Sequence, residues 1–136
     1  MAYSSIVAHQ IAQILDAAGI GTFATDIFVA KEPETPDNAI TVYNVGGIPD
    51  NCLDRDERSG EVHNFQVRVR NRDYLAAHAA MESIRDELEK QTKTLIDSGG
   101  TNTFQIWQET LPIDLQRDTT NRAIVVANFA CMRSYA

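Results

Sequence analysis

The chain has 136 residues and a formal net charge of −7, with 43% hydrophobic and 23% charged residues. This length and composition predict one folded domain over residues 1–136 and exclude an intrinsically disordered chain. The acidic balance argues against a general polyanion-binding protein, and the lack of an apolar run near about 20 residues argues against a membrane span.

The N-terminal stretch is expected to form a helix. Ser4 or Ser5 can cap its start, and Gly19 and Gly21 are expected to end it. The stretch also lacks the basic start of a signal peptide, so synthesis and folding in the cytoplasm are expected. Its apolar residues recur at helical spacing and include Val7, Ile11, Ile14 and Ala18.

Two strands are expected next, at residues 26–30 and 39–45. Residues 31–38 lie between them and contain two prolines, which exclude regular structure. Residues 39–45 are rich in β-branched and aromatic side chains, which favour strands. A polar stretch at 46–60 is predicted to be a loop, and loops of that length are usually functional or mobile.

Residues 61–71 alternate between apolar and polar side chains, which is typical of a strand with one buried face. Val67 and Val69 are expected to face the core, while Arg68 and Arg70 face outward. Asp73 then caps a second helix. The predicted apolar stripe of this helix consists of Tyr74, Ala77, Met81, Ile84 and Leu88, with His78 and Arg85 at its margin.

Further strands are expected at residues 102–109, more weakly at 111–117, and at 122–135, with turn residues at 118–121. The resulting order is α-β-β-β-α-β-(β)-β. This order predicts an α+β fold, built from a single, mostly antiparallel β-sheet with two helices packed on one face.

Signatures of known chemistry are absent from the sequence, which contains no nucleophile elbow, phosphate-binding glycine loop or CxxC motif. His9, His63 and His78 lack metal-ligand spacing, so no metal and no cofactor are expected. Cys52 and Cys131 do not form a disulfide framework. Asp50, Asp54 and Asp56 resemble a calcium loop only superficially, because the required Gly and Glu are out of register.

Arg68, Arg70 and Arg72 occupy every second position of an acidic chain, and three interpretations compete. The arginines can simply solvate the outer face of a sheet. They can contact nucleic-acid phosphates, although no basic surface or aromatic platform supports them. They can also pair with carboxylates of a neighbouring identical chain, since the guanidinium fork suits carboxylates and a head-to-tail contact closes a ring. We favour this third interpretation.

The charge distribution supports an interface between copies. Residues 1–60 carry nine acids against three bases, a net of −6, whereas residues 61–136 carry ten against nine, a net of −1. The acids concentrate at 31–37 and 50–57. Replacing Arg68 and Arg70 with glutamate is therefore expected to weaken a ring and leave the fold intact. The interface candidates are Arg68, Arg70, Arg72, Asp50, Asp54, Asp56 and Glu57.

The whole layout resembles the tail terminators of tailed bacteriophages, a group that includes minor capsid and tail-completion proteins. The resemblance rests on chain length, element order, the acidic loop between strands, the run FQVRVRNRDYLAAHAAMESIRDEL and the late strand IVVANFAC. It implies a sheet with two helices on one side, and a virion protein that acts by binding, not as an enzyme. No catalytic residue is implied.

The resemblance further implies a hexameric ring that caps the tail tube, ends its polymerisation and joins tail to head. The implied partners are identical copies, the tail tube protein and head–tail connector proteins, with DNA only passing through the lumen. A head–tail connector or neck-completion protein is an alternative within the same machinery. A small cytoplasmic enzyme or ligand-binding domain is the alternative from another class.

Overall fold

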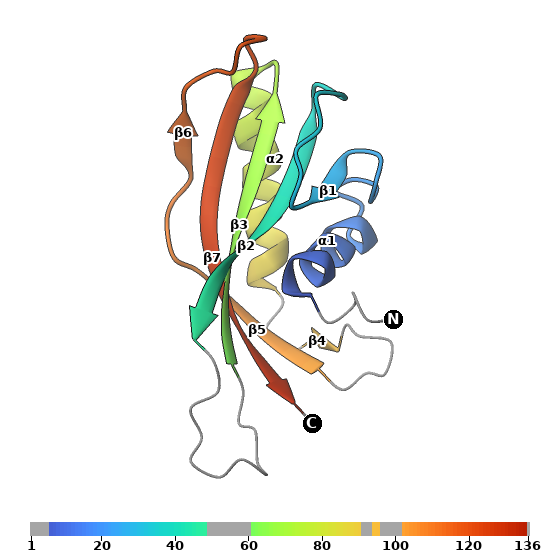
Figure 1. Ribbon diagram of the computed structural model, residues 1–136, viewed down its shortest axis with the longest axis vertical. Helices are drawn as coiled ribbons and strands as arrows, with labels where there is room; N and C mark the ends of the chain where they lie inside the picture. Colours follow the sequence, from blue (N-terminus) through green and yellow to red (C-terminus); the bar gives the residue numbers. More distant parts are fainter. Residues whose placement is uncertain (1–5, 49–60, 91–93, 96–101, 136) are drawn as a thin grey trace.

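A computed structural model describes residues 6–48, 61–90, 94–95 and 102–135. Its order of elements confirms the predicted α+β fold and adds one short strand that the sequence did not predict, β4 (Figure 1). The elements are α1 (Val7–Ala17), β1 (Ile27–Val29), β2 (Ala39–Ile48), β3 (Glu61–Asn71), α2 (Tyr74–Glu89), β4 (Thr94–Leu95), β5 (Asn102–Gln108), β6 (Ile113–Leu115) and β7 (Ala123–Tyr135).

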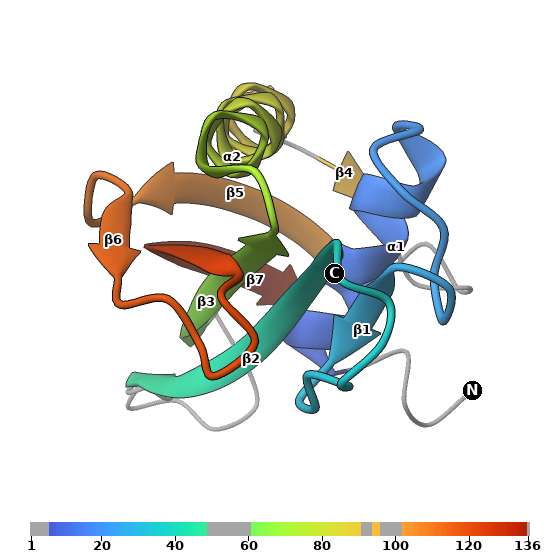
Figure 2. The same cartoon turned by 90° about the horizontal axis from the view of Figure 1, so that it is seen from above.

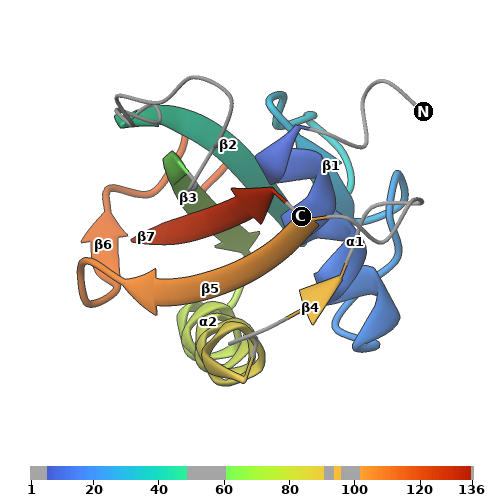
Figure 3. The ribbon, with the colours of Figure 1, turned by 90° about the horizontal axis from the view of Figure 1, so that it is seen from below.

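The strands form one sheet in the order β1-β2-β3-β7-β5-β4, and β6 pairs with β7 beyond the end of β5. Only the β1–β2 pair is parallel among these pairings. In register, Val67 of β3 lies opposite Val42 of β2 and Ala127 of β7. Figure 2 shows α2 on the far side of the sheet from the β6–β7 connection, and Figure 3 shows β6 next to the end of β5.

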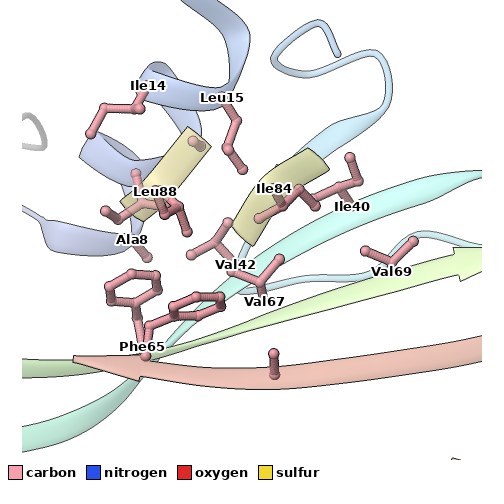
Figure 4. Close-up of a cluster of buried hydrophobic side chains, with 14 of the residues drawn as sticks. Ala8, Ile14, Leu15, Ile40, Val42, Phe65, Val67, Val69, Ile84 and Leu88 are labelled. Carbon is pink, nitrogen blue, oxygen red and sulfur yellow. The ribbon is translucent and has the colours of Figure 1, made fainter. Parts of the chain in front are cut away.

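The core lies between the sheet and the two helices. Alternate residues of β3 point into it, so Phe65, Val67 and Val69 are almost completely buried beneath both helices (Figure 4). The rings of Phe65 and Phe129 stack with their centroids 5.4 Å apart. Because every second residue of a strand points to the same side, the intervening residues, including Arg68 and Arg70, lie on the opposite side. We call that side the helix-free face.

A side-chain cap explains where α2 begins, but no side chain caps the start of α1. Asp73 caps α2 as predicted, because its carboxylate accepts a hydrogen bond from the Leu75 amide at 3.1 Å. Ile6 stands at the N-cap of α1 without a side-chain cap, and the predicted caps Ser4 and Ser5 lie outside the described residues. Four of the five residues predicted for the buried stripe of α2 are buried. The fifth, Tyr74, is 42% exposed.

Strand β2 extends three residues further than predicted, to Ile48, so the predicted loop at 46–60 begins inside a strand. The extension contains a bulge between Asn44 and Gly47. Gly47 has φ +152°, and a Cβ atom there would lie 2.0 Å from the Val62 carbonyl oxygen. Glycine is therefore required where the bulge brings β2 against β3.

Candidate functional site

A cluster of arginines and carboxylates occupies one end of the helix-free face. Arg68 and Arg70 of β3 lie in register with Val126 and Ile124 of β7. The connection between β1 and β2 contributes the carboxylates. We call residues 31–37 of this connection the acidic segment. It has no regular secondary structure, as its prolines predicted.

Arg70 is the buried centre of this cluster, with a side-chain exposure of 3%. Its guanidinium donates to the carbonyl oxygens of Pro36 and Asp37 at 2.6 and 3.2 Å, and to Glu32 Oε1 at 3.0 Å. The expectation that Arg70 faces outward into solvent is therefore wrong for the single chain. Strand alternation placed it correctly on the helix-free face, but the acidic segment covers that position.

Arg68 and Arg72 flank Arg70 and remain more accessible. Arg68 Nε lies 2.6 Å from Glu32 Oε2, and its side chain is 30% exposed. Arg72 is 62% exposed and pairs with Asp37. The Arg72 hydrogen bond lowers the pKa of Asp37 below its usual value, and Asp37 in turn raises the pKa of Arg72. All three predicted arginines therefore contact carboxylates of their own chain.

A fourth arginine, Arg122, joins the cluster from the start of β7. Its side chain is 4% exposed, and it donates to the Glu34 carbonyl oxygen at 2.6 Å and to Asp118 Oδ2 at 2.8 Å. Asp118 also accepts from the Thr120 amide and hydroxyl and from the Arg122 amide. Burial alone would raise the pKa of Asp118, but these hydrogen bonds lower it to about 2. Asp118 is therefore a carboxylate that the fold holds ionised.

The cluster fastens the acidic segment to β3 and β7. Buried arginines satisfy backbone carbonyl oxygens that a segment without regular structure leaves unpaired. Because these guanidinium groups are already bonded to carboxylates and carbonyls, the cluster is a structural clamp and not an open anion site. Of the predicted interface residues, the arginines come together, whereas Asp50, Asp54, Asp56 and Glu57 lie outside the described residues.

Sequence reasoning did not predict the other members of this cluster, which are Glu32, Glu34, Asp37, Asp118 and Arg122. A signal existed for Glu32, because the acidic segment had been recognised as one of two acid-rich stretches. What the sequence did not indicate was that this stretch meets the arginines within one chain. Asp118 and Arg122 bracket the predicted turn at 118–121, where only turn chemistry was recognised.

A smaller polar cluster joins β6 to α2 on the helix-bearing side of the sheet. Asp114 accepts a hydrogen bond from the Tyr74 hydroxyl at 2.6 Å and lies 2.6 Å from His78 Nε2. The hydrogen bond from Tyr74 lowers the pKa of Asp114 most, and the hydrogen bond with His78 lowers it further. Within the described part of the chain, no group of three or more His, Cys, Asp or Glu side chains could hold a metal ion. No helix described is long and apolar enough to cross a bilayer.

Comparison with known proteins places this fold in a family. The profile of a family described as bacteriophage tail terminator protein matches residues 14–135. A solved chain from a structure described as "Virion of native gene transfer agent (GTA) particle" shares 17% identity at a TM-score of 0.64, covering 97% of this chain and 98% of that one.

A second solved chain, whose description states no function, shares 16% identity at a TM-score of 0.52 and covers 100% of this chain and 97% of that one. At such identities the two structures show the shared fold alone. No curated protein sequence matches the chain. The family match spans nearly the whole chain, so this protein belongs to the bacteriophage tail terminator family and is a structural component of a phage tail.

Proposed function

We propose that this protein forms a ring, hexameric by the family resemblance, that caps the completed tail tube. The ring ends polymerisation of the tube and joins tail to head, with DNA passing through its lumen. The observation that carries this proposal is the tail terminator match over residues 14–135. The protein acts by binding the tail tube protein and head–tail connector proteins, and it catalyses no reaction.

Head-to-tail contact between copies is the physical basis of such a ring. A heterologous interface uses two different surfaces of one chain and closes when the rotation between neighbours closes. A terminator then needs one ring face that matches the last ring of the tube and another that does not continue it. A folded domain with different surfaces on its two sides, as in the helix-bearing and helix-free sides here, meets that need.

The predicted interface through arginines stays a prediction, and it now involves Arg68 and Arg72 but not Arg70. Arg68 and Arg72 keep 30% and 62% of their side chains exposed, and each has a carboxylate partner already in place. Contact with Asp50, Asp54, Asp56 or Glu57 of a neighbouring copy would use that remaining exposed surface. Arg70 is buried and is therefore not a probe of assembly, because its replacement by glutamate would disrupt the clamp within each chain.

Electron microscopy tests the proposed function directly. Negative-stain images of the purified protein are expected to show rings. When the protein is added to tubes of the cognate tail tube protein, rings are expected at the tube ends, and tubes growing in its presence are expected to stop elongating. Tubes that elongate equally with and without the protein, and that carry no density at their ends, would contradict the proposal.

Arg68→Glu with Arg72→Glu tests the arginine interface in the same assay, with circular dichroism as the control for folding. The folding control is essential because Arg68 shares Glu32 with Arg70, and Arg72 shares Asp37 with Arg122. If the double variant folds and forms capping rings like the parent protein, the two arginines only solvate the sheet and the acidic segment.

A further inference from the structure

Four large apolar side chains are exposed together on the helix-free face. Register places them there: Trp107 of β5 lies opposite Ala130, while Ile113 and Leu115 of β6 lie opposite Val126 and Ile124. Paired residues in adjacent strands point to the same face of a sheet. Met132 follows Ala130 at a spacing of two and shares its face. The exposures are 41% for Trp107, 44% for Ile113, 42% for Leu115 and 41% for Met132.

The orientation of β6 is confirmed independently by its middle residue. Asp114 points to the opposite side, where it meets Tyr74 and His78 of α2. Ile113 and Leu115 therefore point away from the helices, since successive strand residues alternate. We call Trp107, Ile113, Leu115 and Met132 the apolar patch. Its residues come from β5, β6 and β7, and Figure 3 shows β5 and β6 along the same side of β7.

Among the described residues, positive and negative charges on the helix-free face balance one another. On the same face, Gln66 donates to Asn128 at 3.1 Å. The ion pairs there join four arginines to four carboxylates: Arg68, Arg70, Arg72 and Arg122 to Glu32, Glu34, Asp37 and Asp118. Trp, Met, Tyr and Arg are enriched at protein interfaces, whereas Lys, Glu and Asp are depleted. The apolar patch, which contains Trp and Met and no Lys, Glu or Asp, therefore has a composition typical of an interface.

The outer side of α2 differs from this face in charge. Between Glu82 and Lys90, helix α2 and its C-cap carry four acids against two bases. A basic partner would be drawn to that acidic side by electrostatic complementarity. An acidic partner would be repelled there and would meet least repulsion on the helix-free face.

We propose that the apolar patch is a contact surface for a second copy of this chain. A second copy carries the same net charge of −7, so it is an acidic partner, and the charge-balanced helix-free face repels it less than the acidic side of α2 does. Burial of the four exposed side chains would stabilise the contact. The inference rests on the proposed self-association and adds the surface that performs it, centred on Trp107.

Trp107 provides a direct probe, because it is the only tryptophan in the chain. Fluorescence of the unmodified protein is recorded over a dilution series, with sedimentation measured on the same samples. On association, the emission of Trp107 is expected to shift to shorter wavelength and its quenching by acrylamide to fall. Both changes are expected at the concentration at which the sedimentation coefficient rises.

A matched pair of variants tests the same surface. Met132→Glu places one new carboxylate in the apolar patch, and Gln13→Glu places one on the exposed side of α1. Both change the net charge equally, and circular dichroism checks that each folds. Met132→Glu is expected to weaken association at least about tenfold, because an unpaired charge would be desolvated at the contact. Gln13→Glu is expected to associate like the parent chain.

The outcomes separate this inference from the proposed function. If rings form and cap tubes while Trp107 emission stays constant and Met132→Glu assembles normally, the apolar patch is not the contact and the proposed function stands. If the chain is monomeric at every concentration and Trp107 responds only when tubes are added, the patch binds the tube protein, and a second copy is excluded as its occupant. If the chain neither associates nor caps tubes, the proposed function itself fails.

Discussion

Arg70 and Arg72 lie two residues apart and begin with the same chemistry, yet the fold gives them different roles. Arg70 is 3% exposed and bonds to two carbonyl oxygens and a carboxylate of the acidic segment. Arg72 is 62% exposed and has one carboxylate partner, Asp37. An exposed ion pair contributes little to stability, whereas removing one partner from a buried pair leaves an uncompensated charge and unpaired acceptors.

Arg70→Met is accordingly expected to lower the free energy of unfolding by about 3–5 kcal/mol. Arg72→Met, the same substitution on the same strand, is expected to have a much smaller effect. Urea denaturation of both variants beside the parent protein measures the difference. Equal losses from the two substitutions would show that the carbonyl contacts of Arg70 do not stabilise the fold.

The lowered pKa of Asp118 predicts that the folded state loses stability in acid. The pKa of this carboxylate is lowered from 3.8 to about 2, so the folded state binds its proton less readily than the unfolded state. Its contribution to stability is therefore fully present above about pH 4 and is lost as the pH falls toward 2. Stability measured between pH 5 and 2 is expected to fall less steeply for Asp118→Asn than for the parent chain. Parallel curves would mean that Asp118 has no lowered pKa.

Helix α2 shows how an element is fixed by both its end and its face. Asp73 sets its first turn, and Ala77, Met81, Ile84 and Leu88 are fully buried against the sheet. The polar cluster of Tyr74, His78 and Asp114 fastens the short strand β6 to the same helix. A three-residue edge strand has few ladder hydrogen bonds, so these side-chain contacts help to define its position.

Ile84→Ala is expected to lower the free energy of unfolding by roughly 2–5 kcal/mol, since the residue is completely buried and its truncation leaves a cavity. Ser83→Ala serves as the control, because Ser83 is its exposed neighbour on the same helix. Exposed substitutions of this kind usually change stability by less than about 0.5 kcal/mol. An effect of that small size at Ile84 would show that α2 does not pack through this face.

At the scale of the whole molecule, hydrophobic packing on one side of the sheet and the arginine clamp on the other hold the fold together. In the described part of the chain, no group of three or more His, Cys, Asp or Glu side chains is placed to hold a metal ion. The midpoint of thermal unfolding is therefore expected to be the same with and without a strong chelator, because a bound structural metal adds its binding free energy to folding. A clear fall in the midpoint on chelation would reveal a metal site.

The sequence by itself determined the order of elements apart from β4, the bounds of β3, the cap of α2 and most of the residues that β3 and α2 bury. These features depend on local periods of two and 3.6 residues and on capping chemistry, which neighbouring residues specify. The tail terminator resemblance, later confirmed by the family match, also rested on this local pattern.

Only the tertiary structure decided what covers each face. Alternation placed Arg70 on the side away from the helices, but contacts with Glu32 and Pro36, 38 and 34 positions earlier in the chain, buried it. Tertiary structure also decided that Trp107, Ile113 and Leu115 share one face. They come from β5 and β6, and both strands pair with β7. A periodic pattern specifies which way a side chain points, whereas its exposure depends on distant segments whose approach that pattern does not encode.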